Sequence, residues 1–166
     1  MTTAKKLVRM EVKGLMLDPT SNMPIVILRD AEGSEFLPIW IGVFEANAIA
    51  LKLEGIEPQR PMTHDFLANV LDQLETRVER VIVCDLEEST FYAQVILVSD
   101  REEITVDSRP SDAIALALRV NAPIFAAPSV FEKAKAADLA ERISDEEKLK
   151  KWLEDVDPEE LGKYTM

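Results

Sequence analysis

The chain has 166 residues, 31 of them acidic and 19 basic, which gives a formal net charge of −12 at pH 7. This length suits one compact domain that buries a core without disulfides or a structural metal. Lysine and arginine supply most of the affinity of non-specific nucleic-acid binding, so the acidic balance argues against a broad nucleic-acid surface. A nucleic-acid partner would need a local basic cleft or a bound metal.

Cysteine content and hydropathy indicate the compartment. Cys84 is the single cysteine and lies in the strand-like segment VIVCDL, so the chain cannot form an intrachain disulfide. The beginning, MTTAKKLVRMEVKG, has lysines but no apolar segment behind them, and no long apolar run occurs elsewhere. We therefore expect a cytoplasmic protein that is neither exported nor inserted in a membrane.

The first half predicts three antiparallel strands and a helix. Residues 7–17, 24–28 and 35–41 have strand-like composition and are separated by turn residues. Pro38 cannot donate to a β-ladder, so the third strand is expected at a sheet edge or at a bulge. A helix follows at 43–54, with Gly55 as its C-terminal cap.

The helix at 43–54 has apolar residues on two sides. Glu45 and Lys52 lie on one polar stripe, and Asn47 and Glu54 lie on another, roughly opposite. The apolar surface between the stripes predicts burial on both sides. One side is expected to form a subunit interface.

The second half repeats this layout without residue-level similarity. Apolar residues at helical spacing predict a helix over 64–74, three strands follow at 78–86, 91–98 and 103–107, and a second helix covers 111–120. The fold class is therefore predicted as α+β: a compact domain of mixed or antiparallel sheet flanked by helices.

The end of the chain is predicted to be a separate appendage. Residues 1–131 form the domain, and residues 132–166 form an acidic helical extension. Ser144 and Glu147 match a capping box, and Trp152 with Leu153 would dock the extension.

The segment RPMTHDF contains the only histidine and allows two interpretations. Thr63 could cap the following helix while Asp65 complements the helix dipole, which needs no function. Alternatively, His64 acts as a general acid or base oriented by Asp65 or Glu45, and Arg60 binds a phosphate. The residue types suffice for phosphodiester chemistry, but His–Asp pairs are common.

A second Arg-Pro occurs in DSRPSDAIALAL and is equally ambiguous. In a structural role, Ser108 or Ser111 caps the helix, and Arg109 bridges to Asp107 or a strand carbonyl. In a functional role, Arg109 and the first arginine lie beside helix N-termini and bind an anion, with Asp112 in the first helical turn.

Metal binding depends on carboxylates. The sequence has no pair of histidines, no glycine-rich phosphate loop and no cysteine pair for zinc. Mg²⁺ or Mn²⁺ would suit oxygen ligands, provided that four carboxylates converge. These are Glu45, Asp65, Asp107 and Asp112.

Four segments, spread over residues 7–131, resemble the bifunctional nuclease family: LPIWIGVFEANAIAL, RPMTHDFLANVL, TFYAQVIL and DSRPSDAIALALRVNAPIF. The ending WLEDVDPEELGKY is similar to the tail of some bacterial members. The resemblance implies a compact α+β fold, oligomeric assembly and a DNA- and RNA-cleaving activity reported for some members. It also points to the polar or exposed residues of these motifs as site candidates: Trp40, Glu45, Arg60, Thr63, His64, Asp65, Asp107, Arg109, Ser111 and Asp112.

Two hypotheses follow. In the first, the chain is a nuclease in which His64, Asp65, Glu45 and Asp112 are catalytic, while substrate phosphate is bound by other residues of the motifs: Arg60, Arg109, Trp40 and Ser111. In the second, it is a non-enzymatic oligomeric module that binds a small anion or a protein partner. Both expect a homo-oligomer, with a dimer favoured.

Overall fold

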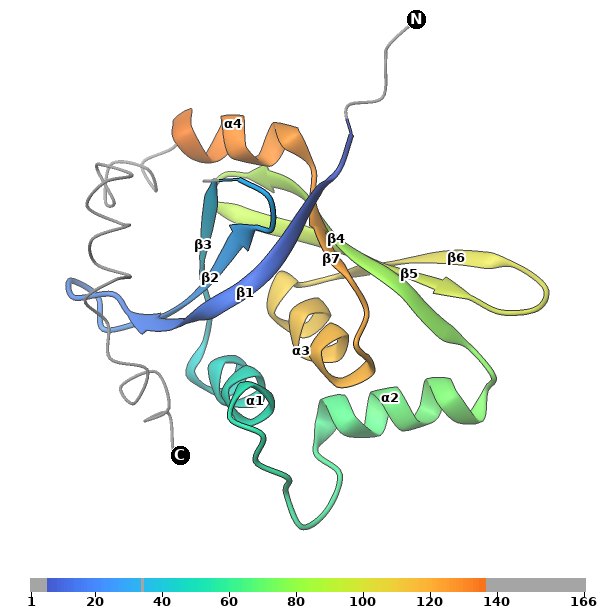
Figure 1. Cartoon of the computed structure of the whole chain (residues 1–166). Coiled ribbons are helices and arrows are strands. Elements are labelled where there is room, and N and C mark those ends of the chain that lie inside the picture. Colours follow the sequence, from blue (N-terminus) through green and yellow to red (C-terminus); the bar gives the residue numbers. More distant parts are fainter. Residues whose placement is uncertain (1–5, 34, 137–166) are drawn as a thin grey trace, which may run out of the picture.

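The computed structural model describes residues 6–33 and 35–136. Within these residues the strands are β1 (Val8–Leu17), β2 (Pro24–Asp30), β3 (Phe36–Trp40), β4 (Arg77–Glu87), β5 (Thr90–Val98), β6 (Glu103–Ser108) and β7 (Ile124–Ala126). The helices are α1 (Val43–Leu53), α2 (Thr63–Gln73), α3 (Pro110–Val120) and α4 (Pro128–Ala136) (Figure 1). The predicted α+β class is confirmed.

The strands form one seven-stranded sheet in the order β3-β2-β1-β7-β4-β5-β6. All neighbours pair antiparallel except β4 and β7, which are parallel. The two predicted three-strand units are thus confirmed, and β3 lies at an edge as Pro38 requires. Strand β7 was missed, although it joins the two units by pairing with both β1 and β4.

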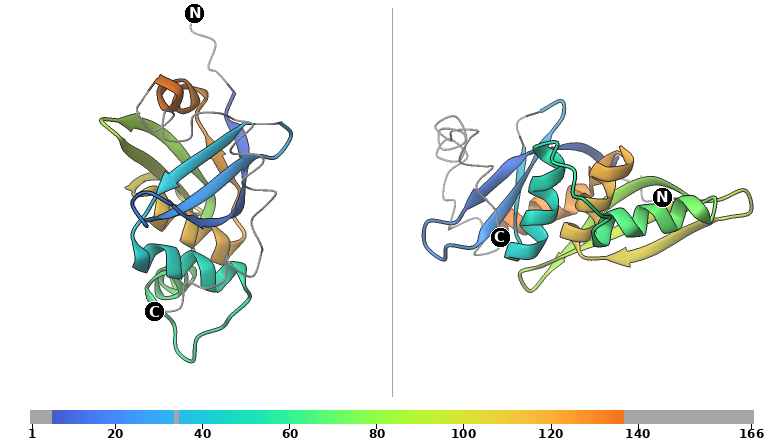
Figure 2. Two further views of the ribbon diagram at one scale, coloured as in Figure 1. Left: turned by 90° about the vertical axis from the view of Figure 1, so that its left-hand side faces the viewer. Right: turned by 90° about the horizontal axis from the view of Figure 1, so that it is seen from below.

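Helix α3 lies in the middle of the molecule. It contacts β4 and β5, and both α1 and α2 pack against it (Figures 1 and 2). Helix α4 lies at the end of the molecule that is opposite α1 and α2 (Figure 1). The small residues Ala113, Ala115 and Ala117 are at most 2% exposed, which allows this close packing. The helix ends at Asn121 in the left-handed conformation, as predicted (φ 55°).

The surfaces of α1 and α2 differ from the prediction. The centre of α1 is buried, including Asn47 at 7% exposure, which was expected on a polar stripe. Phe44 at its start is 73% exposed in the single chain, so burial on this side stays a prediction that depends on a subunit interface. Helix α2 has no buried residue, and the apolar side chains of Phe66 and of the C-cap residue Leu74 are more than 60% exposed. This helix contributes little to the core.

The remaining fold predictions concern membrane spans and the C-terminal extension. No helix in residues 6–33 and 35–136 is long and apolar enough to cross a membrane. Helix α4 spans the predicted domain boundary at 131, and its Val130 is fully buried. The predicted capping box at Ser144 and the docking residues Trp152 and Leu153 lie outside the described residues.

Candidate active site

The start of helix α2 carries three predicted residues, Thr63, His64 and Asp65. Met62 is the N-cap residue and Thr63 is already helical, so the predicted capping by the Thr63 hydroxyl is wrong. The backbone N–H of Met62 instead donates to Oδ2 of Asp65 at 2.9 Å. The Asp65 carboxylate therefore stabilises the N-terminus of α2, in agreement with its predicted helix-start role.

The second helix start is that of α3, where a serine cap was predicted. Arg109 is the N-cap residue, Pro110 takes the first helical position, and no side chain caps the helix. The hydroxyl of Ser108 donates to the carbonyl of Arg109 at 2.8 Å, and Ser111 lies within the helix. The predicted serine cap is therefore wrong.

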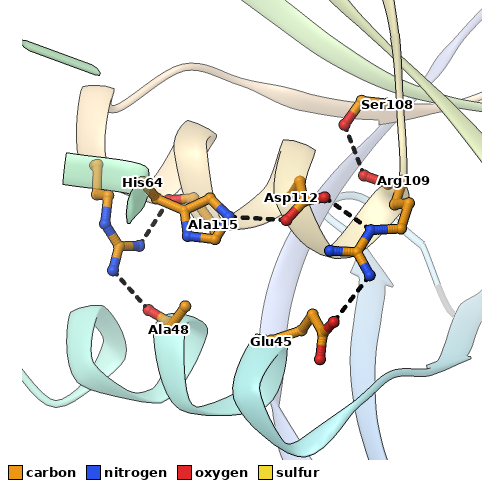
Figure 3. A network of polar contacts seen from close by, with 8 residues as sticks. Glu45, Ala48, His64, Ser108, Arg109, Asp112 and Ala115 are labelled. Carbon is orange, nitrogen blue, oxygen red and sulfur yellow. Dashed lines mark hydrogen bonds and ion pairs between the residues drawn. The ribbon is translucent and has the colours of Figure 1, made fainter. Parts of the chain in front are cut away.

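Four predicted residues form one continuous polar network, the His64–Glu45 network (Figure 3). Nε2 of His64 lies 2.9 Å from Oδ1 of Asp112. Oδ2 of Asp112 accepts from Nε of Arg109 at 2.8 Å, and Nη1 of Arg109 donates to Oε1 of Glu45 at 2.8 Å. Each of α1, α2 and α3 thus contributes to the network.

The network fixes charge states. Burial opposes ionisation of Asp112, but hydrogen bonds from Arg109 and then His64 outweigh it and lower the pKa of this carboxyl below 3.8. Hydrogen bonds to Asp112 and then Glu45 raise the pKa of Arg109. Because an ionised carboxylate only accepts hydrogen bonds, Nε2 of His64 must be the donor toward Asp112. In a neutral ring, Nδ1 is then the nitrogen left to accept a proton.

Asp65 does not orient His64 as predicted. Its Oδ1 accepts from Nε of Arg119 at 2.8 Å, and the Arg119 side chain is only 5% exposed. Arg119 also donates to the carbonyls of Ala115 at 2.8 Å and Ala48 at 2.9 Å. Sequence reasoning missed this arginine, although a lone basic residue at the end of an otherwise apolar helix was a usable signal.

The remaining predicted residues divide into two groups. Arg60 is exposed in the loop between α1 and α2, and no hydrogen bond or ion pair within the described part of the chain joins it to the network. Trp40 and Ser111 line a pocket of about 310 Å³ together with Glu45 and Arg109. Thus the second Arg-Pro motif belongs to the site, whereas the first contributes only its histidine.

The pocket lies at two connections between a strand and a helix, from β3 to α1 and from β6 to α3. Its further lining residues, which sequence reasoning did not identify, are Met23, Ile39, Ile41, Gly42, Ser89, Thr90, Phe91 and Pro110. Nε1 of Trp40 donates to Oδ2 of Asp18 at 2.8 Å, and the Trp40 side chain also packs against Ile25 and its neighbours on β1 and β2. This hydrogen bond, followed by a backbone bond from Thr20, lowers the pKa of the Asp18 carboxyl.

The carboxylates considered for metal binding do not converge. Glu45 and Asp112 meet at Arg109, Asp65 binds Arg119, and Asp107 is exposed on β6. Across residues 6–33 and 35–136, no group of three or more His, Cys, Asp or Glu side chains is placed to hold a metal ion.

Comparison with known proteins places the chain in a family. Residues 26–138 match the family model described as the bifunctional nuclease domain. Two uncharacterized proteins of Mycobacterium tuberculosis are 40% identical over 159 residues, which cover 90% of this chain and 95% of each relative. Bifunctional nuclease 2 of Oryza sativa subsp. japonica is 28% identical over 116 residues, which cover 68% of this chain but 36% of that protein. The chain therefore belongs to the bifunctional nuclease domain family.

Proposed function

We propose that this chain hydrolyses phosphodiester bonds in DNA or RNA at the His64–Glu45 network and the adjoining pocket. The observation that carries the proposal is the hydrogen bond between His64 and Asp112, because it links a proton-transfer group to the phosphate-binding side chain Arg109. Family membership and the name of the rice relative support the same chemistry.

Each residue has a distinct role in this proposal. Asp112 orients His64, as a carboxylate orients the histidine in other acid–base pairs. His64 takes a proton from the attacking water or gives one to the leaving oxygen when the phosphorus–oxygen bond breaks. Arg109 binds the phosphate through its guanidinium. Asp65 acts indirectly, by fixing the start of the helix that carries His64.

His64 does not line the pocket and is joined to Arg109 through Asp112. The pocket lining includes Arg109 and Glu45 but neither His64 nor Asp112, and the His64 side chain is 13% exposed. The Arg109 side chain is 63% exposed, so it can leave its carboxylates and turn to a phosphate in water.

The test compares His64→Ala with Arg101→Ala, an exposed charge in the β5–β6 loop. His64→Ala should reduce turnover of end-labelled single-stranded DNA and RNA by about 10² to 10⁴, whereas Arg101→Ala should leave it unchanged. Unfolding curves for both variants separate lost chemistry from lost structure. Protein from a nuclease-deficient host avoids contamination, and the assay is run with and without Mg²⁺, Mn²⁺ and a chelator. Equal rates for the wild type and His64→Ala would exclude His64 as the catalytic group.

The second candidate is an oligomeric binding module. It is favoured by the charge state of the site, because both carboxylates that flank Arg109 already neutralise its charge, and the chain is acidic overall. If no nucleic acid is cleaved while an anion still binds, this function replaces the first.

Both candidates include self-association, which we assign to the exposed apolar residues of α1 and α2. Phe44 in α1, Phe66 in α2 and Leu74 at the C-terminal end of α2 are each more than 60% exposed, which is unusual for large apolar side chains. Light scattering should give at least twice the monomer mass for the wild type and a lower mass for Phe66→Ser. Tyr92→Ser, at an exposed aromatic residue on β5, is the matched control. A monomeric wild type at high concentration contradicts the assignment.

A further inference from the structure

Ser111 is a buried polar residue with an unused hydroxyl. It is only 6% exposed and lines the pocket, yet its hydroxyl forms no hydrogen bond within the described residues. In that part of the chain, no fully enclosed side-chain nitrogen or oxygen lacks a partner. The Ser111 hydroxyl is therefore accessible from the pocket, where a ligand can bind it.

The same pocket receives the N-termini of α1 and α3. Their N-cap residues, Gly42 and Arg109, both line it, and neither helix has a side-chain cap. The first N–H groups of a helix have no partner within it, and together with the helix dipole they favour an anion. An anion in the pocket thus meets the Arg109 guanidinium, the Ser111 hydroxyl and these N–H groups.

The Glu45 carboxylate already lies at the start of α1, where such an anion would bind. A methyl group built on Gly42 would overlap that carboxylate, so the side chain folds back over the start of its own helix. It also pairs with Arg109. In the absence of ligand, Glu45 supplies the negative charge that a phosphate would bring.

Apart from Ser89 and Thr90, the rest of the pocket lining is apolar, and the pocket is small. Two of its lining residues, Trp40 and Phe91, are aromatic, and the others include Met23, Ile39 and Ile41. A planar base suits such a lining. A volume of about 310 Å³ is at the lower end for ligand pockets.

The charges around the pocket favour a short ligand over a long nucleic-acid strand. Arg109 is the only basic residue among the lining residues of the described chain, and the protein as a whole carries a charge of −12. A long strand needs several cations along its phosphates to bind well. One cation is enough for a single phosphate.

We propose that the pocket binds one nucleotide unit, with its phosphate on Arg109, Ser111 and the two helix N-termini, and its base against Trp40 and Phe91. The phosphate displaces the Glu45 carboxylate from Arg109. The preferred ligands are mononucleotides, dinucleotides and strand ends rather than the interior of a long strand. That these ligands are also cleaved rests on the proposed function.

The binding test uses calorimetry with AMP and with inorganic phosphate. AMP should bind the wild type at least about fivefold more tightly than phosphate, because only AMP has a base. Ser111→Ala should weaken AMP binding about fivefold. Glu45→Gln should strengthen it, because the competing charge is gone, and Arg101→Ala should not change it. If AMP does not bind, or if Glu45→Gln weakens binding, the proposal is wrong.

A cleavage test separates this proposal from the nuclease proposal. The substrates are the phosphorylated dinucleotide pApA and circular single-stranded DNA, which has no ends. Faster cleavage of pApA, with AMP as a competitive inhibitor, supports both proposals. AMP binding without any cleavage supports the nucleotide site and removes the nuclease function. Cleavage of circular DNA that AMP does not inhibit supports the nuclease and overturns the nucleotide site.

Discussion

Helix α3 has an arginine at each end, and the two have different environments. Arg109 at its N-terminus and Arg119 in its last turn each bind a carboxylate of another helix at 2.8 Å. The Arg109 side chain is 63% exposed, whereas the Arg119 side chain is 5% exposed. The ion-pair distances do not distinguish them, but the access of water does.

The difference in exposure gives the two arginines different roles. The buried Arg119 guanidinium donates to Asp65 and to two helix carbonyls, so its removal takes three hydrogen bonds from the contact between α1, α2 and α3. Arg109 holds Glu45 and Asp112 near solvent, where water or a ligand can replace it. We interpret Arg119 as a structural clamp and Arg109 as a binding residue.

The largest expected effect is that of Arg119→Ala on stability. Loss of three hydrogen bonds at a buried charge should lower the free energy of unfolding by about 3 kcal/mol. Chemical denaturation followed by circular dichroism measures this change, with Arg101→Ala as the control. A loss below about 1 kcal/mol would mean that Arg119 is no more structural than a surface arginine.

The second expected effect is on stability at low pH, and it comes from Asp65 and Asp112, the carboxylates that pair with these arginines. The pKa of Asp65 is lowered, because hydrogen bonds from Met62 and Arg119 outweigh its desolvation, and the pKa of Asp112 is lowered as described above. Their ionised forms therefore stabilise the fold at a pH above the unfolded-state pKa near 3.8, and this contribution is lost as the pH falls from there through the folded-state pKa.

Thermal unfolding between about pH 5 and pH 2 should show a weaker pH dependence for Asp65→Asn and Asp112→Asn. Asp100→Asn, at an exposed carboxyl, should follow the wild type, and identical curves for all proteins would contradict the assignment.

A smaller effect on stability is expected for Arg109→Ala. An exposed ion pair contributes at most about 1 kcal/mol, so the unfolding midpoint should change little while AMP binding is lost. Calorimetry and denaturation on the same sample measure both quantities. A stability loss equal to that of Arg119→Ala would remove the distinction between the two arginines.

Much of the fold, but less of the site, could be predicted from sequence. Strand-like composition between turn residues predicted six strands, and helical spacing predicted α1, α2 and α3, because these signals are local. Strand β7 has three residues and exists through pairing with β1 and β4, which no local pattern reveals. Sequence also could not show that α2 has no buried residue, because the same apolar stripe is found on helices that are buried in a core.

In the site, sequence neighbours were misleading. Asp65 adjoins His64 in sequence but binds Arg119, whereas Asp112, 48 positions away, binds His64. The two Arg-Pro motifs also looked equivalent. Only Arg109 contacts the network, because α3 lies between the two other helices. The residue types were predictable, but their pairing depended on helix packing.

The smallest expected effect concerns Gly42→Ala and tests whether the Glu45–Arg109 pair is replaceable. Gly42 has φ −75° and ψ 164°, an ordinary extended conformation, so alanine adds no backbone strain. Its methyl group would displace the Glu45 carboxylate and break the ion pair with Arg109. Because the Arg109 side chain in this ion pair is 63% exposed, we expect a change in unfolding free energy within about 0.5 kcal/mol. Gly42→Ala and Glu45→Ala remove the same contact, so the double variant should be no less stable than the weaker single variant. If the two effects instead add, or if Gly42→Ala costs as much as Arg119→Ala, then Glu45 supports the fold at Gly42 independently of Arg109, and the carboxylate is not the displaceable group that the nucleotide site requires.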